Sequence, residues 1–431
     1  MASSSFATIQ FFLLSTALCS VCCLSASHPP NTKPNPFTLP IKKDPKTNLF
    51  YTSIGIGTPR QDFNLVIDLS GQNLWYGSEP HYNSSSYRPI PCKSKQCHDV
   101  ACIIGCNGPL QPGCTNNTCP AEAVSYFAKF IFGGSLGEDI IFFSQQQVSG
   151  LLSSCITVDG LPSFTNKDSP LIGLPESTKG ILGLARSQLA LPTQLATTNK
   201  LPHKFSLCLP SSNKQGFTNL LVGPELAHTQ KVSKFLQTTP LIVNPVATEP
   251  VSVEGVASKE YFIDVKSVKI DGRVLNLKSS LLAIDKKGNG GTRISTIRPF
   301  TELQGSVYKI FIRDFLKRAS DRKLKRVASV APFEACFDSV NGLAVPTIDL
   351  VLPGGVQWTI HGANSMIMAK KNVACLAIVD GGTETKMSFV KASIVIGGYQ
   401  LQDNLLEFDV ASSKLSFSSS LLLHNATCSH S

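Results

Sequence analysis

The sequence predicts an all-β protein with a few accessory helices, divided into two halves of similar size. Short runs rich in branched and aromatic residues recur along the 431 residues, for example at 63–68, 262–270 and 347–352, each bounded by Gly, Pro, Asn or Ser. The 31 Gly and 27 Pro indicate many turns. With 42% hydrophobic and only 16% charged residues, the chain can bury a core, which excludes an intrinsically disordered protein.

The first element is an apolar segment at 9–24, followed by three small residues. This layout is typical of a secretory signal peptide, which we place at 1–26. The alternative is an N-terminal membrane anchor, which needs roughly 20 apolar residues. No other segment of the chain reaches that length. We therefore expect a secreted protein without a membrane partner, in a compartment where disulfides form. Three sequons, at Asn83, Asn116 and Asn425, are candidate glycosylation sites and agree with secretion.

The cysteines indicate disulfides rather than a metal site. Loss of the leader removes three of the 14 cysteines and leaves an odd number, so at least one thiol has no partner within the chain. A Gly-, Pro- and Asn-rich insertion at 92–119 contains six: Cys92, Cys97, Cys102, Cys106, Cys114 and Cys119. Zinc is the alternative, but an oxidising compartment converts such clusters to disulfides and no histidine pair completes a tetrahedral set. We assign no metal ligand.

The clearest helix is expected at 301–320, where apolar residues recur at helical spacing. The least patterned stretch, 239–254, is the candidate boundary between the halves. We therefore expect an N-terminal lobe at 27–238, which carries the cysteine-rich insertion 92–119, and a C-terminal lobe at 239–431.

Four segments resemble the pepsin-type aspartic proteases. Residues 51–59, Tyr-Thr-Ser-Ile-Gly-Ile-Gly-Thr-Pro, and 63–71, Phe-Asn-Leu-Val-Ile-Asp-Leu-Ser-Gly, are similar to the opening strands of that family. Residues 180–184, Gly-Ile-Leu-Gly-Leu, and 394–398, Ile-Val-Ile-Gly-Gly, are similar to the segments that pass beneath its two catalytic loops. The resemblance covers nearly the whole mature chain, and it implies the bilobal pepsin-like fold with a cleft between the lobes.

The same resemblance implies that proteolysis is lost. Aspartic proteases use two carboxylates that share one proton, one of which activates water. Asp68 stands at the first position, but Ser295 stands at the second and Ile297 replaces the loop glycine. A serine at neutral pH is neither a base nor an anion, and no Tyr-Gly-Asp-Gly-like flap follows Cys119. We therefore assign no catalytic residue, and an active aspartic endopeptidase is the least favoured function.

Further segments are similar to one plant family. They are the six-cysteine insertion, Ser295-Thr296, and the stretches 326–336, 379–382 and 394–404. They resemble the plant extracellular dermal glycoproteins, which are xyloglucan-specific endoglucanase inhibitors related to the cereal xylanase inhibitors and the legume basic 7S globulins. The resemblance implies an extracellular protein of the apoplast or cell wall whose partner is a glycoside hydrolase, an endoglucanase or a xylanase. We expect a monomer with no cofactor and no nucleic-acid partner.

Two basic residues are the candidate inhibitory groups. By position, Arg326 aligns with the inhibitory arginine loop of the family, and Lys391 stands where a second arginine is expected. Retaining glycosidases hold two carboxyl groups about 5 Å apart, and a guanidinium can pair with both oxygens of a carboxylate. A lysine keeps the charge but loses the planar fork. The alternatives are a merely solvated basic helix end at Arg326 and, for the chain, a basic globulin-type storage or peptide-binding protein.

The resemblance also implies a disulfide set. If the insertion pairs internally, Cys336 with Cys375 forms the bridge of the second lobe, and Cys208 with Cys428 ties the lobes together. Cys155 is then the cysteine that keeps its thiol, because Ser78 stands where relatives have a cysteine.

Overall fold

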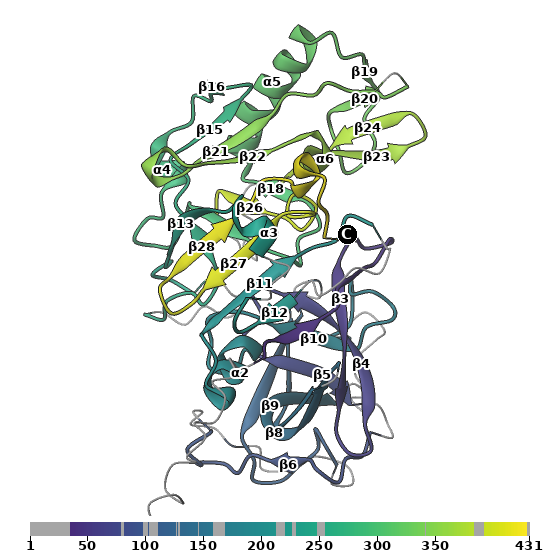
Figure 1. The fold of residues 1–431 in the computed structure, drawn as a ribbon, viewed down its shortest axis with the longest axis vertical. Helices are drawn as coiled ribbons and strands as arrows, with labels where there is room; N and C mark the ends of the chain where they lie inside the picture. Colours follow the sequence, from purple (N-terminus) through teal and green to yellow (C-terminus); the bar gives the residue numbers. More distant parts are fainter. Residues whose placement is uncertain are drawn as a thin grey trace, which may run out of the picture. The chain divides into compact units, whose positions relative to one another are not determined.

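The described residues of the computed structural model form four β-sheets and a few short helices (Figure 1). The structure describes residues 35–78, 82–97, 102, 111–125, 127, 130–144, 146–157, 169–212, 220–225, 230–247, 255–340, 342–382 and 392–428. From Pro36 onward the chain forms one compact unit. The predicted all-β class with accessory helices is confirmed. Within the described part of the chain, no helix is long and apolar enough to cross a bilayer.

The first sheet has nine strands and belongs wholly to the N-terminal half. Its order is β2-β3-β4-β10-β5-β9-β8-β6, and β7 pairs with β8 beside this path. The central strand β4 runs parallel to β10 and has neighbours on both sides, so four of its residues in a row are buried. The strands are β2 (Lys42–Lys43), β3 (Phe50–Ile56), β4 (Gln61–Asp68), β5 (Leu74–Ser78), β6 (Arg88–Pro89), β7 (Pro120–Ser125), β8 (Phe130–Phe143), β9 (Gln146–Thr157) and β10 (Gly180–Gly183).

The second sheet has 11 strands and joins the two halves of the chain. Its order is β1-β12-β11-β27-β28-β13-β14-β17-β26-β18-β25, so three N-terminal strands pair onward into C-terminal ones. The expected boundary at 238–239 falls within β13. The strands are β1 (Phe37–Leu39), β11 (Lys204–Cys208), β12 (Leu220–Val222), β13 (Gln237–Ile242), β14 (Phe262–Ile263), β17 (Thr292–Ile294), β18 (Thr301–Leu303), β25 (Ile378–Asp380), β26 (Ile394–Ile396), β27 (Leu405–Asp409) and β28 (Lys414–Phe417).

Two four-stranded sheets complete the C-terminal half. One has the order β16-β15-β21-β22 and the other β19-β20-β24-β23. Their strands are β15 (Ser267–Ile270), β16 (Arg273–Val274), β21 (Ile348–Val351), β22 (Gln357–Ile360), β19 (Arg326–Val327), β20 (Cys336–Asp338), β23 (Met366–Lys370) and β24 (Val373–Leu376). The helices are α2 (Leu191–Asn199), α3 (Gln230–Ser233), α4 (Ser279–Leu282), α5 (Gly305–Asp321) and α6 (Gly362–Ser365), with 3₁₀ turns η1 (Pro353–Gly355) and η2 (Leu421–His424).

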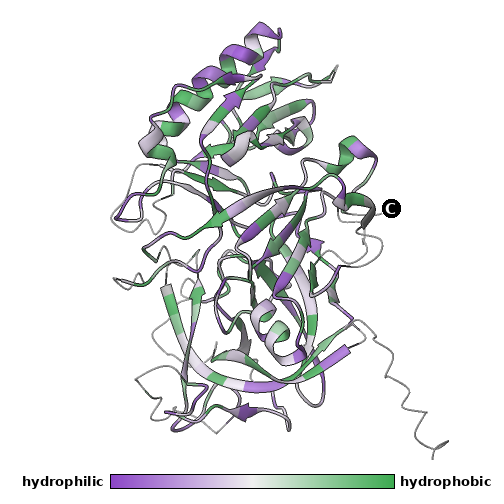
Figure 2. Ribbon diagram, turned by 60° about the vertical axis from the view of Figure 1, so that its left-hand side comes forward, coloured by the Kyte–Doolittle hydropathy of each residue, from purple (hydrophilic) through white to green (hydrophobic). Residues whose placement is uncertain are grey.

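Helix α5 begins four residues later than the sequence predicts. Residues 301–303 instead form β18, which pairs with β25 and β26, so the expectation of a helix from residue 301 was wrong. The side chain of Gln304 then accepts a hydrogen bond from the amide of Ser306 and caps the helix. Apolar and hydrophilic residues alternate along α5 (Figure 2), and Val307, Phe311 and Phe315 form its buried face.

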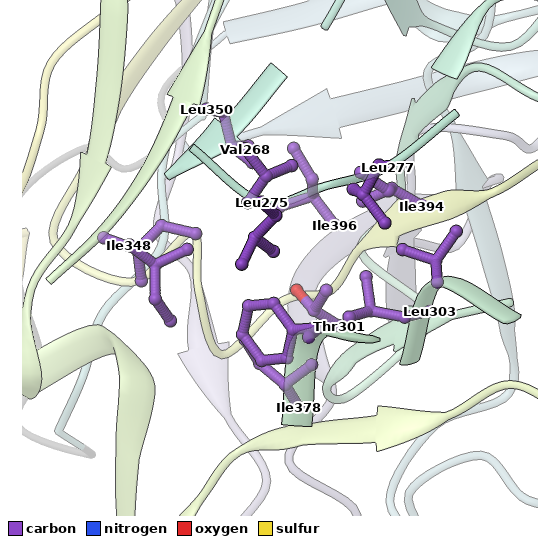
Figure 3. A pocket seen from close by; sticks show the side chains of 13 residues that line it. Val268, Leu275, Leu277, Thr301, Leu303, Ile348, Leu350, Ile378, Ile394 and Ile396 are labelled. Carbon is purple, nitrogen blue, oxygen red and sulfur yellow. The ribbon is translucent and has the colours of Figure 1, made fainter. Parts of the chain in front are cut away.

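The buried face of α5 packs on the sheet that contains β15 and β21 (Figure 1). A small cavity lies in this core, and Figure 3 shows side chains of the surrounding strands, such as Leu350 and Ile396, around it. Val307 and Phe311 of α5 also line it. Thr301 is the one lining residue with a hydroxyl, and that hydroxyl donates to Gln400 Oε1 at 2.8 Å. The cavity therefore offers a ligand no spare polar group, and we interpret it as part of the core.

Candidate functional site

The two loops that would hold a protease dyad occupy equivalent places in the structure. Asp68 ends β4, which pairs in parallel with β10, and Asp68 lies opposite Gly183. Ser295 follows β17, which pairs in parallel with β26, and Ile294 lies opposite Ile396. Asp68 and Ser295 therefore each stand at the end of a strand that pairs with a parallel neighbour in its sheet. This repeated arrangement is the one expected of two related lobes.

Thr296 joins the two loops. Its hydroxyl donates to the carbonyl oxygen of Ile67 at 2.6 Å and accepts from the amide of Leu69 at 3.1 Å. These contacts connect residues more than 220 positions apart in the chain. Leu69 stands one position after Asp68, as Thr296 stands one after Ser295, but leucine has no hydroxyl. The junction between the loops therefore depends on one threonine side chain.

The dyad positions are closed to solvent. Asp68, Ser295 and Thr296 are 0% exposed, and Ile297 is 2% exposed. Ile297 belongs to an apolar cluster with side chains of the N-terminal half: Leu49, Val66, Trp75, Ala123, Ile156, Leu174 and Ile181. The isoleucine that stands in place of a glycine thus fills the space beside the first loop. A substrate would have to displace this packing before it reached either position.

The chemistry available at this position is that of one carboxyl and one hydroxyl. Oδ1 of Asp68 accepts a hydrogen bond from the amide of Ser70 at 2.7 Å. The hydroxyl of Ser295 has no hydrogen-bond partner within the described part of the chain. A serine hydroxyl cannot share a proton with a carboxylate in the way that a second carboxylate can.

A buried ion pair that the sequence reasoning missed lies just before Ser295. Arg293 on β17 pairs with Glu260, and the two side chains are 5% and 0% exposed. Arg186 donates to the carbonyl oxygen of Glu260 at 2.6 Å, and burial lowers the pKa of its guanidinium. Burial raises the pKa of Tyr261, whose hydroxyl donates to the carbonyl oxygen of Leu184 at 2.8 Å. A charged residue in the middle of a short strand, between Thr292 and Ile294, was the available signal.

Arg326 is the first residue of β19, which lies at the edge of its sheet. Its side chain is exposed and makes no hydrogen bond or ion pair within the described residues. Arg326 lies opposite Phe337 on β20, and Phe337 contacts Phe315 of α5 with ring centroids 6.4 Å apart. The loop 328–332 follows directly, and all of its residues except the half-buried Val330 are exposed. The guanidinium therefore stands on a rigid support beside an open loop.

The second basic candidate, Lys391, lies outside the described residues. The structure therefore does not bring Lys391 and Arg326 together or separate them. The three sequon residues Asn83, Asn116 and Asn425 are exposed, so each can accept a glycan without unfolding. No group of three or more His, Cys, Asp or Glu with metal-binding geometry occurs among the residues that the structure describes.

The disulfides tie down the insertion and link distant parts of the chain. Cys208 is bonded to Cys428 and Cys336 to Cys375. Within the insertion, Cys92 is bonded to Cys102 and Cys97 to Cys119. Cys114 is also disulfide-bonded, and Cys106 lies outside the described residues. Cys155 is a buried thiol on β9, opposite Tyr76 on β5.

Comparison with known protein families gives two matches that together span most of the chain. Residues 50–223 match the model of the xylanase inhibitor N-terminal domain, and residues 260–419 match that of the C-terminal domain.

Individual relatives agree with these matches. The chain is 40% identical over 412 residues to a protein of Nicotiana benthamiana named probable aspartic proteinase GIP2, and the match covers 92% of each chain. It is 32% identical to basic 7S globulin 2 of Glycine max, over 93% of this chain and 91% of that one. Among solved structures, that of edgp superposes with a TM-score of 0.83 and 38% identity, over 94% of this chain and 100% of the other. The soybean basic 7S globulin structure gives a TM-score of 0.75 and 31% identity, over 92% and 98%. The fold is therefore pepsin-like, and the chain belongs to the xylanase-inhibitor family of aspartic-protease-like proteins.

Proposed function

We propose that this protein is a secreted, proteolytically inactive homologue of the aspartic proteases that inhibits a cell-wall glycoside hydrolase, an endoglucanase or a xylanase. The observation that carries the proposal is the exposed Arg326 at a sheet edge, in a chain whose two halves both match xylanase-inhibitor models. The disulfides agree with an extracellular protein of the apoplast. We expect it to act as a monomer without a cofactor.

The loss of proteolysis is supported by residue identity and by packing. Ser295 replaces the second carboxylate, so no pair exists that can share a proton. Ile297 fills the space beside the first loop, and all three residues at 295–297 are buried. A folded protease scaffold without access to its dyad is left with its surface as the means of acting on another protein.

The target's chemistry suits an exposed guanidinium. A retaining glycosidase places two carboxyl groups about 5 Å apart in an open groove that accepts a sugar chain. Arg326 is always charged, and its planar group can bind both oxygens of one carboxylate. An arginine in the groove offers no glycosidic bond for cleavage and excludes the substrate. Because the side chain makes no hydrogen bond or ion pair with any described residue, inserting it breaks no such interaction.

Lys391 is the proposed second group that contacts the glycosidase. A lysine at this position makes the chain less similar to an inhibitor that uses two arginines. A lysine delivers one point charge and cannot make two parallel hydrogen bonds to one carboxylate. We therefore expect Lys391→Arg to tighten inhibition of a target that Arg326 already engages. Basic globulin-type storage or peptide binding remains the second candidate, favoured by this lysine and by 32% identity to basic 7S globulin 2.

The test is a titration of the purified protein against a panel of endoglucanases and xylanases. We expect micromolar inhibition of at least one member, and loss of at least 30-fold in affinity on Arg326→Ala, since truncating one partner of a desolvated charge pair costs about 2 kcal/mol or more. Arg273→Ala is the matched control, because Arg273 is also exposed on a short strand. If no enzyme is inhibited, the globulin-type function replaces the proposal. If both alanine variants inhibit equally well, Arg326 is not the inhibitory group.

A further inference from the structure

We infer that the outer face of α5 is a second binding site, independent of Arg326, for a linear polyuronate, a polysaccharide with one carboxylate on each sugar. Three basic residues, Lys309, Arg313 and Lys317, are exposed on this face at intervals of four residues. Residues four apart lie on the same side of a helix, about 6 Å apart along its axis. The three cations therefore form a gently spiralling row on the solvent side of α5, opposite its buried apolar face.

The charges in this row are poorly compensated within the protein. Lys309 and Lys317 make no hydrogen bond or ion pair with any residue that the structure describes. The acidic groups of the helix are Asp314, which lies 3.6 Å from Arg313 Nε, and Asp321, which pairs with Arg318 at 3.0 Å. Like charges four residues apart destabilise a helix by about 0.2–0.5 kcal/mol for each pair. The row keeps two such pairs, and an anion bound along it would relieve their repulsion.

The row suits a polyanion better than a protein or a nucleic acid. Protein interfaces depend on buried aromatic or apolar anchors, and among the described residues no large exposed hydrophobic side chain lies on α5. Single-stranded nucleic acids are bound by stacking on exposed aromatic rings, but Tyr308, Phe311 and Phe315 are all buried. A row of cations without exposed apolar groups is suited to bind a ligand that presents only regularly repeated negative charge.

The position of α5 gives the row a fixed geometry. The buried face of the helix packs on the sheet of β15 and β21, and Arg322 at its end makes two contacts of 2.7 Å with the carboxylate of Asp271. The helix axis is therefore held at the side of its sheet and at its C-terminal end. The helix sets the Cα positions of the three basic residues. Their side chains can therefore bind successive carboxylates of one extended polymer at the same time.

The experiment compares binding of the whole protein to de-esterified polygalacturonate and to its fully methyl-esterified form, at low and at near-physiological salt. The test variant carries Lys309→Gln, Arg313→Gln and Lys317→Gln. The matched control carries Lys42→Gln, Lys286→Gln and Lys414→Gln, which removes three exposed charges from other elements. Glutamine is a good helix former, so the test variant should fold, and its thermal midpoint is measured as a check.

We expect the native protein and the control to bind only the charged polymer, and the test variant to bind it at least tenfold more weakly than the control. The dependence of binding on salt should also become shallower, because fewer counterions are released when fewer cations contact the polymer. Equal weakening of both triple variants would show that net charge, not the row, attracts the polymer and would overturn the inference. Equal binding of the esterified polymer, or no binding of the native protein, would overturn it as well.

Discussion

Replacing Ser295 by aspartate restores the missing carboxyl and tests whether the dyad position is sealed. The site is 0% exposed, its neighbour Asp68 is also 0% exposed, and Ile297 packs beside them in an apolar cluster. Because burial disfavours the charged form of a carboxyl, it raises the pKa of the introduced aspartate. We expect Ser295→Asp to lower the free energy of unfolding by about 3–5 kcal/mol at neutral pH, the range found for an uncompensated buried charge.

The destabilisation caused by Ser295→Asp should increase as the pH rises. The folded-state pKa of the introduced carboxyl lies above the unfolded value of about 3.9, so the folded protein binds more protons between the two values. The destabilisation relative to the native protein should therefore be small below pH 3.9 and grow by about 1.4 kcal/mol for each pH unit until the folded pKa is reached. Urea denaturation of both proteins from pH 3.5 to pH 7 measures the difference directly.

Ser295→Asn is the matched control, since it adds similar volume without an ionisable group. Its destabilisation should not change with pH. If Ser295→Asp showed the same flat profile, or gained the ability to cleave casein or haemoglobin at acid pH, the account of a sealed position would be refuted. Either result would mean that water and substrate reach the loops despite Ile297.

Two further predictions concern the junction between the loops and the basic row. Thr296→Val should lower the free energy of unfolding by about 1–3 kcal/mol in denaturant titrations, because the carbonyl of Ile67 and the amide of Leu69 stay buried but lose their hydroxyl partner. Thr296→Ser keeps the hydroxyl and should stay close to the native value. Equal loss in both variants would show that the methyl group, not the hydroxyl, matters. Arg313→Glu should raise stability by about 0.5 kcal/mol at low salt, because converting two repulsive contacts, with Lys309 and Lys317, into attractive ones outweighs losing the contact with Asp314, and the gain should fade in high salt. An unchanged or lower thermal midpoint at low salt would contradict the poorly compensated row.

The fold and the chemistry of the dyad positions could be predicted because they depend on short segments. Asp68 ends a strand and Ser295 follows one, and the residues of both strands carry a recognisable local pattern. The packing of Ile297 and the two hydrogen bonds of Thr296 could not be predicted, since they join residues that lie far apart in the chain, more than 220 positions in the case of the hydrogen bonds. Sequence spacing also placed residues 301–303 in a helix, because apolar residues of a buried strand fit the helical period by chance until pairing with β25 and β26 decides the conformation.

For the basic residues, too, the sequence indicated some features and only the structure showed others. The sequence indicated Arg326 through its resemblance to the inhibitory arginine loop of the family. Only the structure gives its edge-strand position and shows that its side chain makes no hydrogen bond or ion pair in the described chain. The row on α5 was visible in the sequence as cations between apolar residues. Its meaning depends on which charges find partners, and that requires the side-chain geometry.

The central claim is that Arg326 occupies the carboxylate groove of a glycoside hydrolase. The most direct test measures initial rates of a sensitive endoglucanase or xylanase at several substrate and several inhibitor concentrations. A group that occupies the substrate's own site should raise KM and leave kcat unchanged, and a groove-binding oligosaccharide should weaken binding of the inhibitor. A fall in kcat with unchanged KM, or inhibitor binding that the oligosaccharide does not affect, would place the contact outside the groove and contradict the account.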